Sequence, residues 1–392
     1  MRSGVLPPLF SAPFYGSQWG PRRRALAILA PVLLLLAACS IRQTPAPVGT
    51  AALRPGQPRR LSDRPALSPP AWSPQGDRIA YATTDGIWVQ PLAGRERRLA
   101  PSGVVTDLAW SPAGQLLAYI DRGEVWVLRV DGSRRRRIRL PPSRDGMPWF
   151  ATHLAWGRTG DRFAVAARAA GARPGAPPRA GVWLLGADGG FRRLVYERTG
   201  VEVAGVQWFP DDLFLFIVVG GREGQPPTLW RWRIAYPDRR PLLRVVPDAW
   251  FHRLSPDGRR VAFVAPEAVR PSAPDGARVP TPSQRQHVWV TNADGGARRR
   301  LTEQAARVTG LDWSPASEKV AFATVLGDAH GEIWIADVVG PGRLRAARFT
   351  AEFPDPALPL QVRWAPDGRH LAYGTNSGSY TGLVWVVPLE RR

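Results

Sequence analysis

The chain has 392 residues, a formal net charge of +21 and a single cysteine. One cysteine excludes an intrachain disulfide framework and a cysteine-based zinc site. The 41 prolines, 39 glycines and 17 tryptophans recur at regular positions, which indicates many short strands joined by turns and excludes a low-complexity chain.

The N-terminus has the pattern of an export signal. The basic cluster of residues 22–24 precedes an apolar run over 25–38, which is too short for a typical membrane-spanning helix and suits the apolar region of a signal peptide. The run ends in Leu36-Ala37-Ala38-Cys39, which resembles the lipobox of bacterial lipoproteins. That resemblance implies cleavage before Cys39 and lipidation of its thiol, with palmitate among the acyl chains. The alternatives are an uncleaved signal anchor and an ordinary secretory signal.

These features predict three segments. Residues 1–38 are expected to be a lipoprotein signal peptide, 39–56 a lipidated cysteine with a Pro- and Ala-rich tether, and 57–392 the folded part. The protein is then exported and held by a lipid anchor on the extracytoplasmic side of a bacterial membrane.

A turn of the type W-S-P-x-G recurs seven times in the folded part. The first residues of the seven copies are Trp72, Trp110, Trp156, Trp208, Leu254, Trp313 and Trp364. A short apolar strand follows each turn, and a second strand centred on a tryptophan comes next. Each unit is predicted to be a four-stranded antiparallel meander, which cannot bury both of its faces alone but can do so when packed radially against its neighbours.

The repeats resemble those of TolB-like and WD-type β-propellers over residues 57–392. The resemblance implies an all-β fold with a single β-propeller. We predict seven four-stranded blades, with six as the alternative because TolB itself has six. The seventh copy ends without a final strand, and Pro58–Ser62 resembles the missing one. We therefore expect an N-terminal strand to close the ring.

Arginine clusters fall on the outermost strand of most repeats, as at 97–98, 134–137 and 298–300. Charged residues on an exposed edge prevent edge-to-edge association, which is one interpretation. The other is attraction to anionic lipids or cell-wall polymers. No nucleic-acid recognition module is present, and we expect no nucleic-acid partner.

The loops between second and third strands are long in consecutive repeats, at 169–180, 220–228, 266–287, 326–331 and 374–382. They are expected on the face opposite the W-S-P turns, and loops on a rigid scaffold often carry binding function. Candidate binding residues are Arg173, Arg179, Arg222, Arg270, Arg278, Arg285, His287, Asn376 and Tyr380. The alternative is that these loops are tolerated insertions without function.

No catalytic motif such as HExxH, a Walker A loop or GxSxG is present. The five histidines are scattered, and we expect no catalytic residue, metal or cofactor. The innermost strands offer Asp107 and Asp312 to the channel of a propeller.

The leading hypothesis is a non-catalytic, monomeric cell-envelope lipoprotein that acts as a scaffold. Its partner would be an envelope protein or an anionic cell-wall or lipid polymer. The alternative is a lyase- or lactonase-like propeller enzyme that uses the central channel, and a third reading is a purely structural envelope protein.

Overall fold

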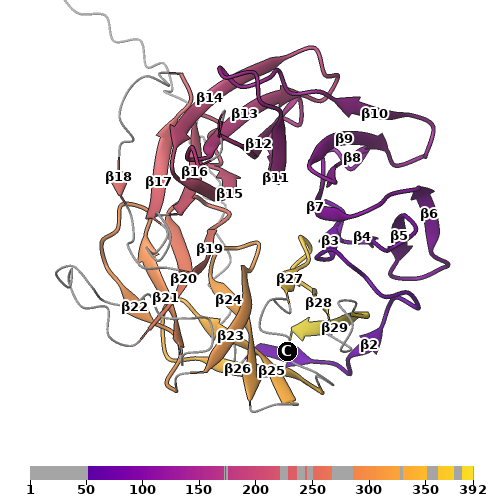
Figure 1. Ribbon diagram of the computed structural model, residues 1–392. Helices are drawn as coiled ribbons and strands as arrows, with labels where there is room; N and C mark the ends of the chain where they lie inside the picture. Colours follow the sequence, from indigo (N-terminus) through magenta and orange to yellow (C-terminus); the bar gives the residue numbers. More distant parts are fainter. Residues whose placement is uncertain are drawn as a thin grey trace, which may run out of the picture. The chain divides into compact units, whose positions relative to one another are not determined.

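The computed structural model describes residues 52–171, 173, 175–220, 228–235, 243–244, 250–266, 286–304, 306–326, 330–350, 361–374 and 382–391. Its regular elements are β-strands, which form seven antiparallel sheets. The sheets are arranged as blades around a common axis (Figure 1). The predicted all-β fold and the seven-bladed propeller are therefore confirmed.

Blades 1 to 3 each contain four strands, numbered outward from the axis. Blade 1 consists of β3 (Ala71–Trp72), β4 (Arg78–Ala82), β5 (Ile87–Pro91) and β6 (Arg97–Ala100). Blade 2 consists of β7 (Val105–Trp110), β8 (Leu116–Asp121), β9 (Glu124–Arg129) and β10 (Arg135–Ile138). Blade 3 consists of β11 (Trp149–Trp156), β12 (Arg162–Ala169), β13 (Arg179–Gly186) and β14 (Arg192–Thr199).

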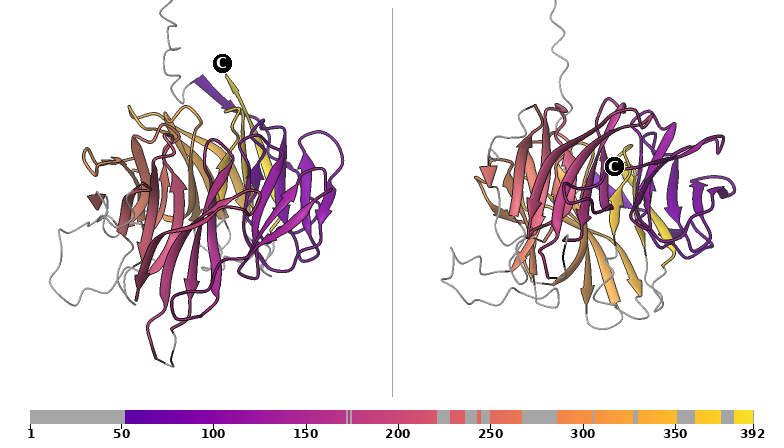
Figure 2. Two further views of the ribbon diagram at one scale, coloured as in Figure 1. Left: turned by 90° about the horizontal axis from the view of Figure 1, so that it is seen from above. Right: turned by 45° about the horizontal axis from the view of Figure 1, so that its top comes forward.

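Blades 4 to 6 repeat the same order. Blade 4 consists of β15 (Glu202–Trp208), β16 (Phe214–Gly220), β17 (Thr228–Arg233) and β18 (Leu243–Arg244). Blade 5 consists of β19 (Trp250–Leu254), β20 (Arg260–Pro266), β21 (Gln286–Asn292) and β22 (Arg299–Arg300). Blade 6 consists of β23 (Arg307–Trp313), β24 (Lys319–Leu326), β25 (His330–Asp337) and β26 (Arg343–Thr350). Figure 2 shows from the side that the strands run from one face of the ring to the other.

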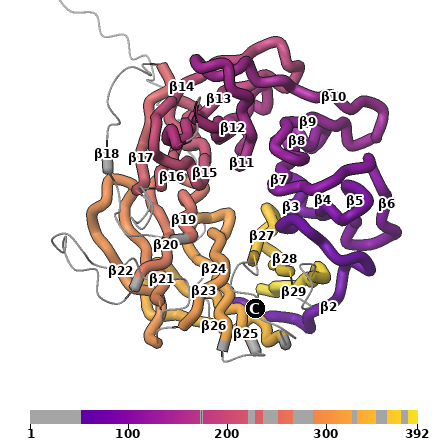
Figure 3. Tube along the Cα trace, viewed as in Figure 1, coloured from indigo at the N-terminus to yellow at the C-terminus, as the bar shows by residue number. Residues whose placement is uncertain are grey.

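Blade 7 is completed by the N-terminal end of the described chain. It contains β27 (Val362–Trp364), β28 (His370–Gly374) and β29 (Val384–Arg391). Strand β2 (Arg59–Arg60) pairs with β29, so the expected closing strand is confirmed. In Figure 3 the indigo segment that carries β2 lies beside the yellow β29.

A second N-terminal strand, β1 (Leu53–Pro55), also pairs with β29, toward its C-terminal end. These residues fall in the segment expected to be a tether, so strand pairing begins before residue 57. The physical reason is the side chain of Leu53, which is only 7% exposed and packs in the same apolar cluster as Leu389.

Each W-S-P turn joins the first and second strands of its blade, and in four of the seven copies a serine stabilises it. The hydroxyl of Ser111 accepts the backbone N–H of Leu116 at 3.0 Å, and Ser255 and Ser314 accept the corresponding N–H groups of their own turns. The turns close on residues with left-handed φ, such as Gly258 at 71°, a conformation that costs glycine little.

Neighbouring blades are joined at their innermost strands by the tryptophan that opens the W-S-P turn. Its indole N–H donates to the backbone carbonyl of the residue just before the corresponding position in the preceding blade. The bonds are Trp72 to Arg363 (3.2 Å), Trp110 to Ala71 (2.9 Å), Trp156 to Ala109 (3.1 Å), Trp208 to Ala155 (2.9 Å) and Trp313 to Arg253 (2.9 Å). The repeated tryptophan therefore links neighbouring blades through a hydrogen bond at five of the seven junctions.

The two other junctions are bridged by a side chain from the preceding blade. Between blades 4 and 5, where Leu254 replaces the tryptophan, Gln207 Oε1 accepts the backbone N–H of Leu254 at 2.7 Å. Between blades 6 and 7, Asp312 Oδ2 accepts the backbone N–H of Trp364 at 2.8 Å. Each junction of the inner ring thus has at least one hydrogen bond.

Arginines of the outer edges also join blades. Arg59 donates to the carbonyl of Leu92 at 2.9 Å, Arg97 to that of Val130 at 2.5 Å and Arg299 to that of Val338 at 2.5 Å. In each case the arginine lies on an outermost strand and the carbonyl follows the third strand of the next blade. Some of the edge arginines therefore form hydrogen bonds to the neighbouring blade in addition to placing positive charge on the edge strand.

Candidate functional site

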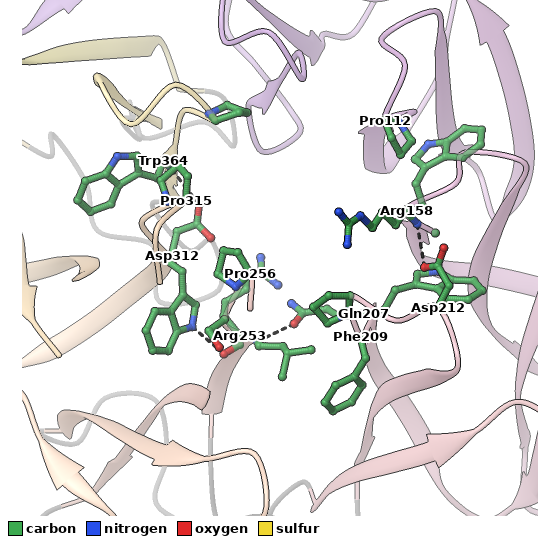
Figure 4. Close-up of a pocket in the computed structure, with 18 of the residues that line it drawn as sticks. Pro112, Arg158, Gln207, Phe209, Asp212, Arg253, Pro256, Asp312, Pro315 and Trp364 are labelled. Carbon is green, nitrogen blue, oxygen red and sulfur yellow. Dashed lines mark hydrogen bonds between the residues drawn. The ribbon is translucent and has the colours of Figure 1, made fainter. Parts of the chain in front are cut away.

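The W-S-P turns enclose a cup of about 740 Å³ at one mouth of the channel (Figure 4). Its rim carries exposed prolines from four turns, which are Pro112, Pro256, Pro315 and Pro366. Half-buried indoles of Trp156 and Trp208 form part of its wall. The four turns that carry these prolines are each closed by a backbone hydrogen bond of 2.8–2.9 Å, which fixes the shape of the rim.

A second cavity of about 560 Å³ lies inside the ring and is lined by the innermost strands. Three residues line both cavities, namely Gln207, Arg253 and Arg363. We call these three residues the channel neck, because they mark where the cup opens into the channel.

The neck residues occupy one repeated position, the residue before the tryptophan of each W-S-P turn. In blade order that position holds Ala71, Ala109, Ala155, Gln207, Arg253, Asp312 and Arg363. Blades 1 to 3 therefore present alanine there, and blades 4 to 7 present long or charged side chains. We refer to these as the alanine half and the polar half of the channel.

The acidic groups of the channel are engaged with the backbone. Asp107 Oδ1 accepts the N–H of Leu108 and Oδ2 that of Leu154, both at 2.9 Å. Asp312 holds Trp364 as described above. Of the two acids that the sequence offered to the channel, Asp107 lines the inner cavity and Asp312 lines the cup at its mouth, and both link neighbouring blades.

The two neck arginines have no such ionic partner. Within the chain that the structure describes, no carboxylate lies within 4.0 Å of the guanidinium of Arg253 or Arg363. Arg363 donates to the carbonyl of Val362 at 3.3 Å and to the side-chain oxygen of Gln361. Burial lowers the pKa of Arg363 to about 10, with Arg253 acting in the same direction and Asp312 and Asp107 opposing it. Arg363 therefore remains charged at neutral pH.

Two histidines also line the channel, and both are neutral at neutral pH. Burial lowers the pKa of His252 to about 3, and the charge of Arg253 and the neighbouring His153 add to this. Burial also lowers the pKa of His153, which Asp107 partly opposes. Among the described residues, no group of three or more His, Cys, Asp or Glu side chains is placed to hold a metal ion.

Phe251 is the most strained residue of the channel wall. It lies beside the neck with a φ of 44°, in the left-handed region that non-glycine residues rarely adopt, and it is 38% exposed. Such a conformation costs about 1–2 kcal/mol and is found preferentially at functional sites.

Of the candidate binding residues, the structure describes three. Arg173 is exposed in the connection between β12 and β13. Arg179 instead begins β13, where its guanidinium contacts Asp145 at 2.6 Å and Glu197 at 3.5 Å. Arg222, Arg270, Arg278, Arg285, Asn376, Tyr380 and Cys39 lie outside the described residues.

His287 does not lie in a loop. It belongs to β21, is 1% exposed, and its Nδ1 lies 2.9 Å from the hydroxyl of Thr302. The expected loop over 266–287 is therefore shorter at its C-terminal end, because the buried face of β21 continues to Gln286. The structure does not bring Arg173, Arg179 and His287 together, since the first two belong to blade 3 and the last to blade 5.

The sequence interpretation missed the neck. Arg253, Arg363 and Gln207 are not among the residues predicted from the sequence, and the spacing of the histidines does not indicate that His153 and His252 line one cavity. A usable signal was present, because aligning the seven copies on their turn places these residues at one inward-facing position.

In the part of the chain that the structure describes, no helix is long and apolar enough to cross a membrane. No model of a known protein family matches the sequence, and no curated protein matches it either.

Solved structures do resemble the chain. An oligogalacturonate lyase in complex with manganese is similar at a TM-score of 0.64 and 11% identity, over 86% of this chain and 96% of that one. The β-propeller domain of Cps50 (Swd1) from Myceliophteria thermophila is similar at 0.54 and 15%, over 85% and 99%. A putative TolB from Agrobacterium tumefaciens has a TM-score of 0.47 at 16% identity, over 76% of this chain and 94% of that one. These likenesses show the β-propeller fold alone, and the fold does not decide between a scaffold and an enzyme.

Proposed function

We propose that this chain is a non-catalytic binding propeller of the bacterial cell envelope, exported and anchored through Cys39, which holds an envelope protein or polymer in its cup. The observation that carries the proposal is the cup itself, a concave surface of about 740 Å³ with exposed prolines, indoles and arginine on rigid turns. Aromatic side chains and arginine are enriched where proteins bind partners.

The state of the channel acids supports binding over catalysis. Asp107 and Asp312 each accept a backbone N–H from the next blade, so one oxygen of each carboxylate is engaged in holding the ring. His252, with its pKa lowered to about 3, is a weak proton acceptor. These groups are better suited to structure than to acid–base chemistry.

The test is a crosslinked pull-down from native membranes with matched baits. The cup variant carries Pro315→Glu and Pro366→Glu, which place charge on the rim at turn positions that tolerate most residues. The control carries Pro74→Glu, the same change in the blade 1 turn, which does not line the cup. We expect the wild type and the control to capture one partner and the cup variant to lose it.

A further bait separates the two faces of the ring. In it the connection over residues 170–178 is shortened to a tight turn. A partner lost only from this bait would bind the face opposite the cup and contradict the proposal, as would equal capture by every bait.

The anchor is tested separately by metabolic labelling with palmitate. We expect the wild type to incorporate label and Cys39→Ser to remain unlabelled. Label that persists in the variant would contradict lipidation at Cys39, the only cysteine of the chain.

A further inference from the structure

The channel neck places two cations where both cavities meet. Arg253 and Arg363 line both the cup and the channel. Their positive charges repel each other, so neither arginine can compensate the charge of the other. Two like charges in a partly desolvated channel are unfavourable unless an anion compensates them.

The acids of the channel do not supply that compensation through direct contact. Asp107 and Asp312 are turned to backbone N–H groups, and neither comes within 4.0 Å of a neck guanidinium. A direct ion pair would be the simplest arrangement for arginines and aspartates in one channel. Its absence among the described residues leaves guanidinium donors facing the cavity.

The donors that remain match the oxygen atoms of an anion. Arginine presents planar, paired N–H groups that suit a carboxylate or a phosphate, and charged hydrogen bonds of this kind are roughly twice as strong as neutral ones. The amide of Gln207 is the third neck group, and Phe251, which is 38% exposed, lines the same cavity.

We propose that Arg253 and Arg363 form an anion-binding site at the channel neck, which takes a carboxylate or phosphate group. The inference rests on the proposed function, since an acidic group of a partner seated in the cup would reach this pair. A free small anion has the same chemistry, and the experiment distinguishes the two sources.

The first arm measures small anions alone. The full chain in detergent is titrated with inorganic phosphate and with succinate at constant ionic strength, and binding is followed by calorimetry and by the melting temperature. Butane-1,4-diol serves as the uncharged counterpart of succinate. We expect at least one of the two anions to bind and raise the melting temperature, and the diol to do neither.

Variants place the anion at the neck. Arg253→Gln and Arg363→Gln should each weaken binding about tenfold or more, the range expected for a lost hydrogen bond to a charged group. Arg134→Gln removes the same charge from an exposed position on the outer edge and should bind like the wild type. Arg363→Lys keeps the charge without the paired donors and should be intermediate, which preserves the test if a glutamine variant fails to fold.

Three results would overturn the site. They are equal weakening by Arg134→Gln, unchanged binding in both glutamine variants, and no binding of either anion by the wild type. The second arm repeats the pull-down with Arg253→Gln. Partner capture that survives there, with anion binding lost, would leave the scaffold standing and overturn the link between the site and the partner.

Discussion

The alanine half and the polar half of the channel differ at one repeated position within the same four-stranded blade. In blades 1 to 3 that position holds Ala71, Ala109 and Ala155, whose carbonyls accept an indole N–H from the next blade. In blades 4 to 7 the same position holds side chains that extend into the channel. Two of them, Gln207 and Asp312, hold the next blade.

The difference separates stability from function within one repeat. The tryptophan of the turn and its bond to a backbone carbonyl need no particular side chain at the preceding position. That position is therefore free to vary, and in this chain it varies toward charge on one side of the ring only. The polar half is itself mixed, because Asp312 is used by the backbone and Arg253 is not.

The largest effect on the free energy of unfolding is expected at the tryptophan that links two blades. Trp313 is 4% exposed and donates to the carbonyl of Arg253, so Trp313→Ala removes both core packing and the bond between blades. We expect the free energy of unfolding to fall by about 3–5 kcal/mol, as for other buried aromatic residues replaced by alanine. Denaturant unfolding measures it. Trp313→Phe keeps most of the packing but loses the indole N–H and should cost less, and a Trp313→Phe variant as stable as the wild type would show that the bond contributes nothing.

The next largest effect on the free energy of unfolding is expected at Asp312, which holds the next blade from the polar half. Asp312→Ala leaves the backbone N–H of Trp364 without its acceptor and should lower the free energy of unfolding by about 1–3 kcal/mol. Asp312→Asn keeps an acceptor oxygen and should cost clearly less. If both variants were as stable as the wild type, the sixth and seventh blades would not depend on this contact.

The neutral histidine should make stability depend on pH. The pKa of His252 falls from its ordinary value of 6.5 to about 3 on folding, so below pH 6.5 the unfolded chain binds a proton that the folded chain does not. Stability is full above pH 6.5 and falls as the pH drops toward 3. We expect the free energy of unfolding to fall by about 1–2 kcal/mol. This is less than the whole pKa shift would give at ~1.4 kcal/mol for each pKa unit, because the open channel can hydrate the imidazolium.

The control for this dependence is His252→Gln, which cannot titrate. Unfolding curves between pH 7 and pH 4 should be flatter for the variant than for the wild type. Curves of equal slope would mean that other groups, such as His153 or the acids, carry the acid sensitivity.

The smallest effect is expected at Arg253, and it sharpens the contrast with Asp312. Arg253→Ala relieves repulsion with Arg363 and leaves the carbonyl that accepts the Trp313 indole in place. We expect the free energy of unfolding to stay within about 0.5 kcal/mol of the wild type, as for residues retained for function and not for stability. A loss of the size expected for Asp312→Ala would assign Arg253 to structure.

Much of the fold could be predicted because its signals are local and repeated. The seven W-S-P turns, the strand after each turn and the PRRLS segment each rest on residues close in sequence, and the structure confirms the blades and the closing strand. The pairing of Leu53 with Arg391 was not predicted, since it joins opposite ends of the chain through a strand of three residues.

The candidate site could be predicted only in part. Asp107 and Asp312 were expected at the channel, and Asp107 lines the inner cavity while Asp312 lines the cup at its mouth. Their bonds to Leu154 and Trp364 depend on how far one blade is rotated against the next, which no single repeat encodes. His287 was placed in a loop because the end of a long insertion has no local marker, whereas its burial comes from the neighbouring strands.

By itself the sequence determined the repeat, the all-β fold and the way the ring closes, because turn chemistry and strand alternation act over a few residues, and it left six blades as the alternative to seven. Only the tertiary structure decided what the repeats build together. Side chains from blades 4, 5 and 7 meet at the channel neck because radial packing brings one position of each repeat to a common axis. Residues distant in the chain acquire there a shared electrostatic environment that none of them has alone.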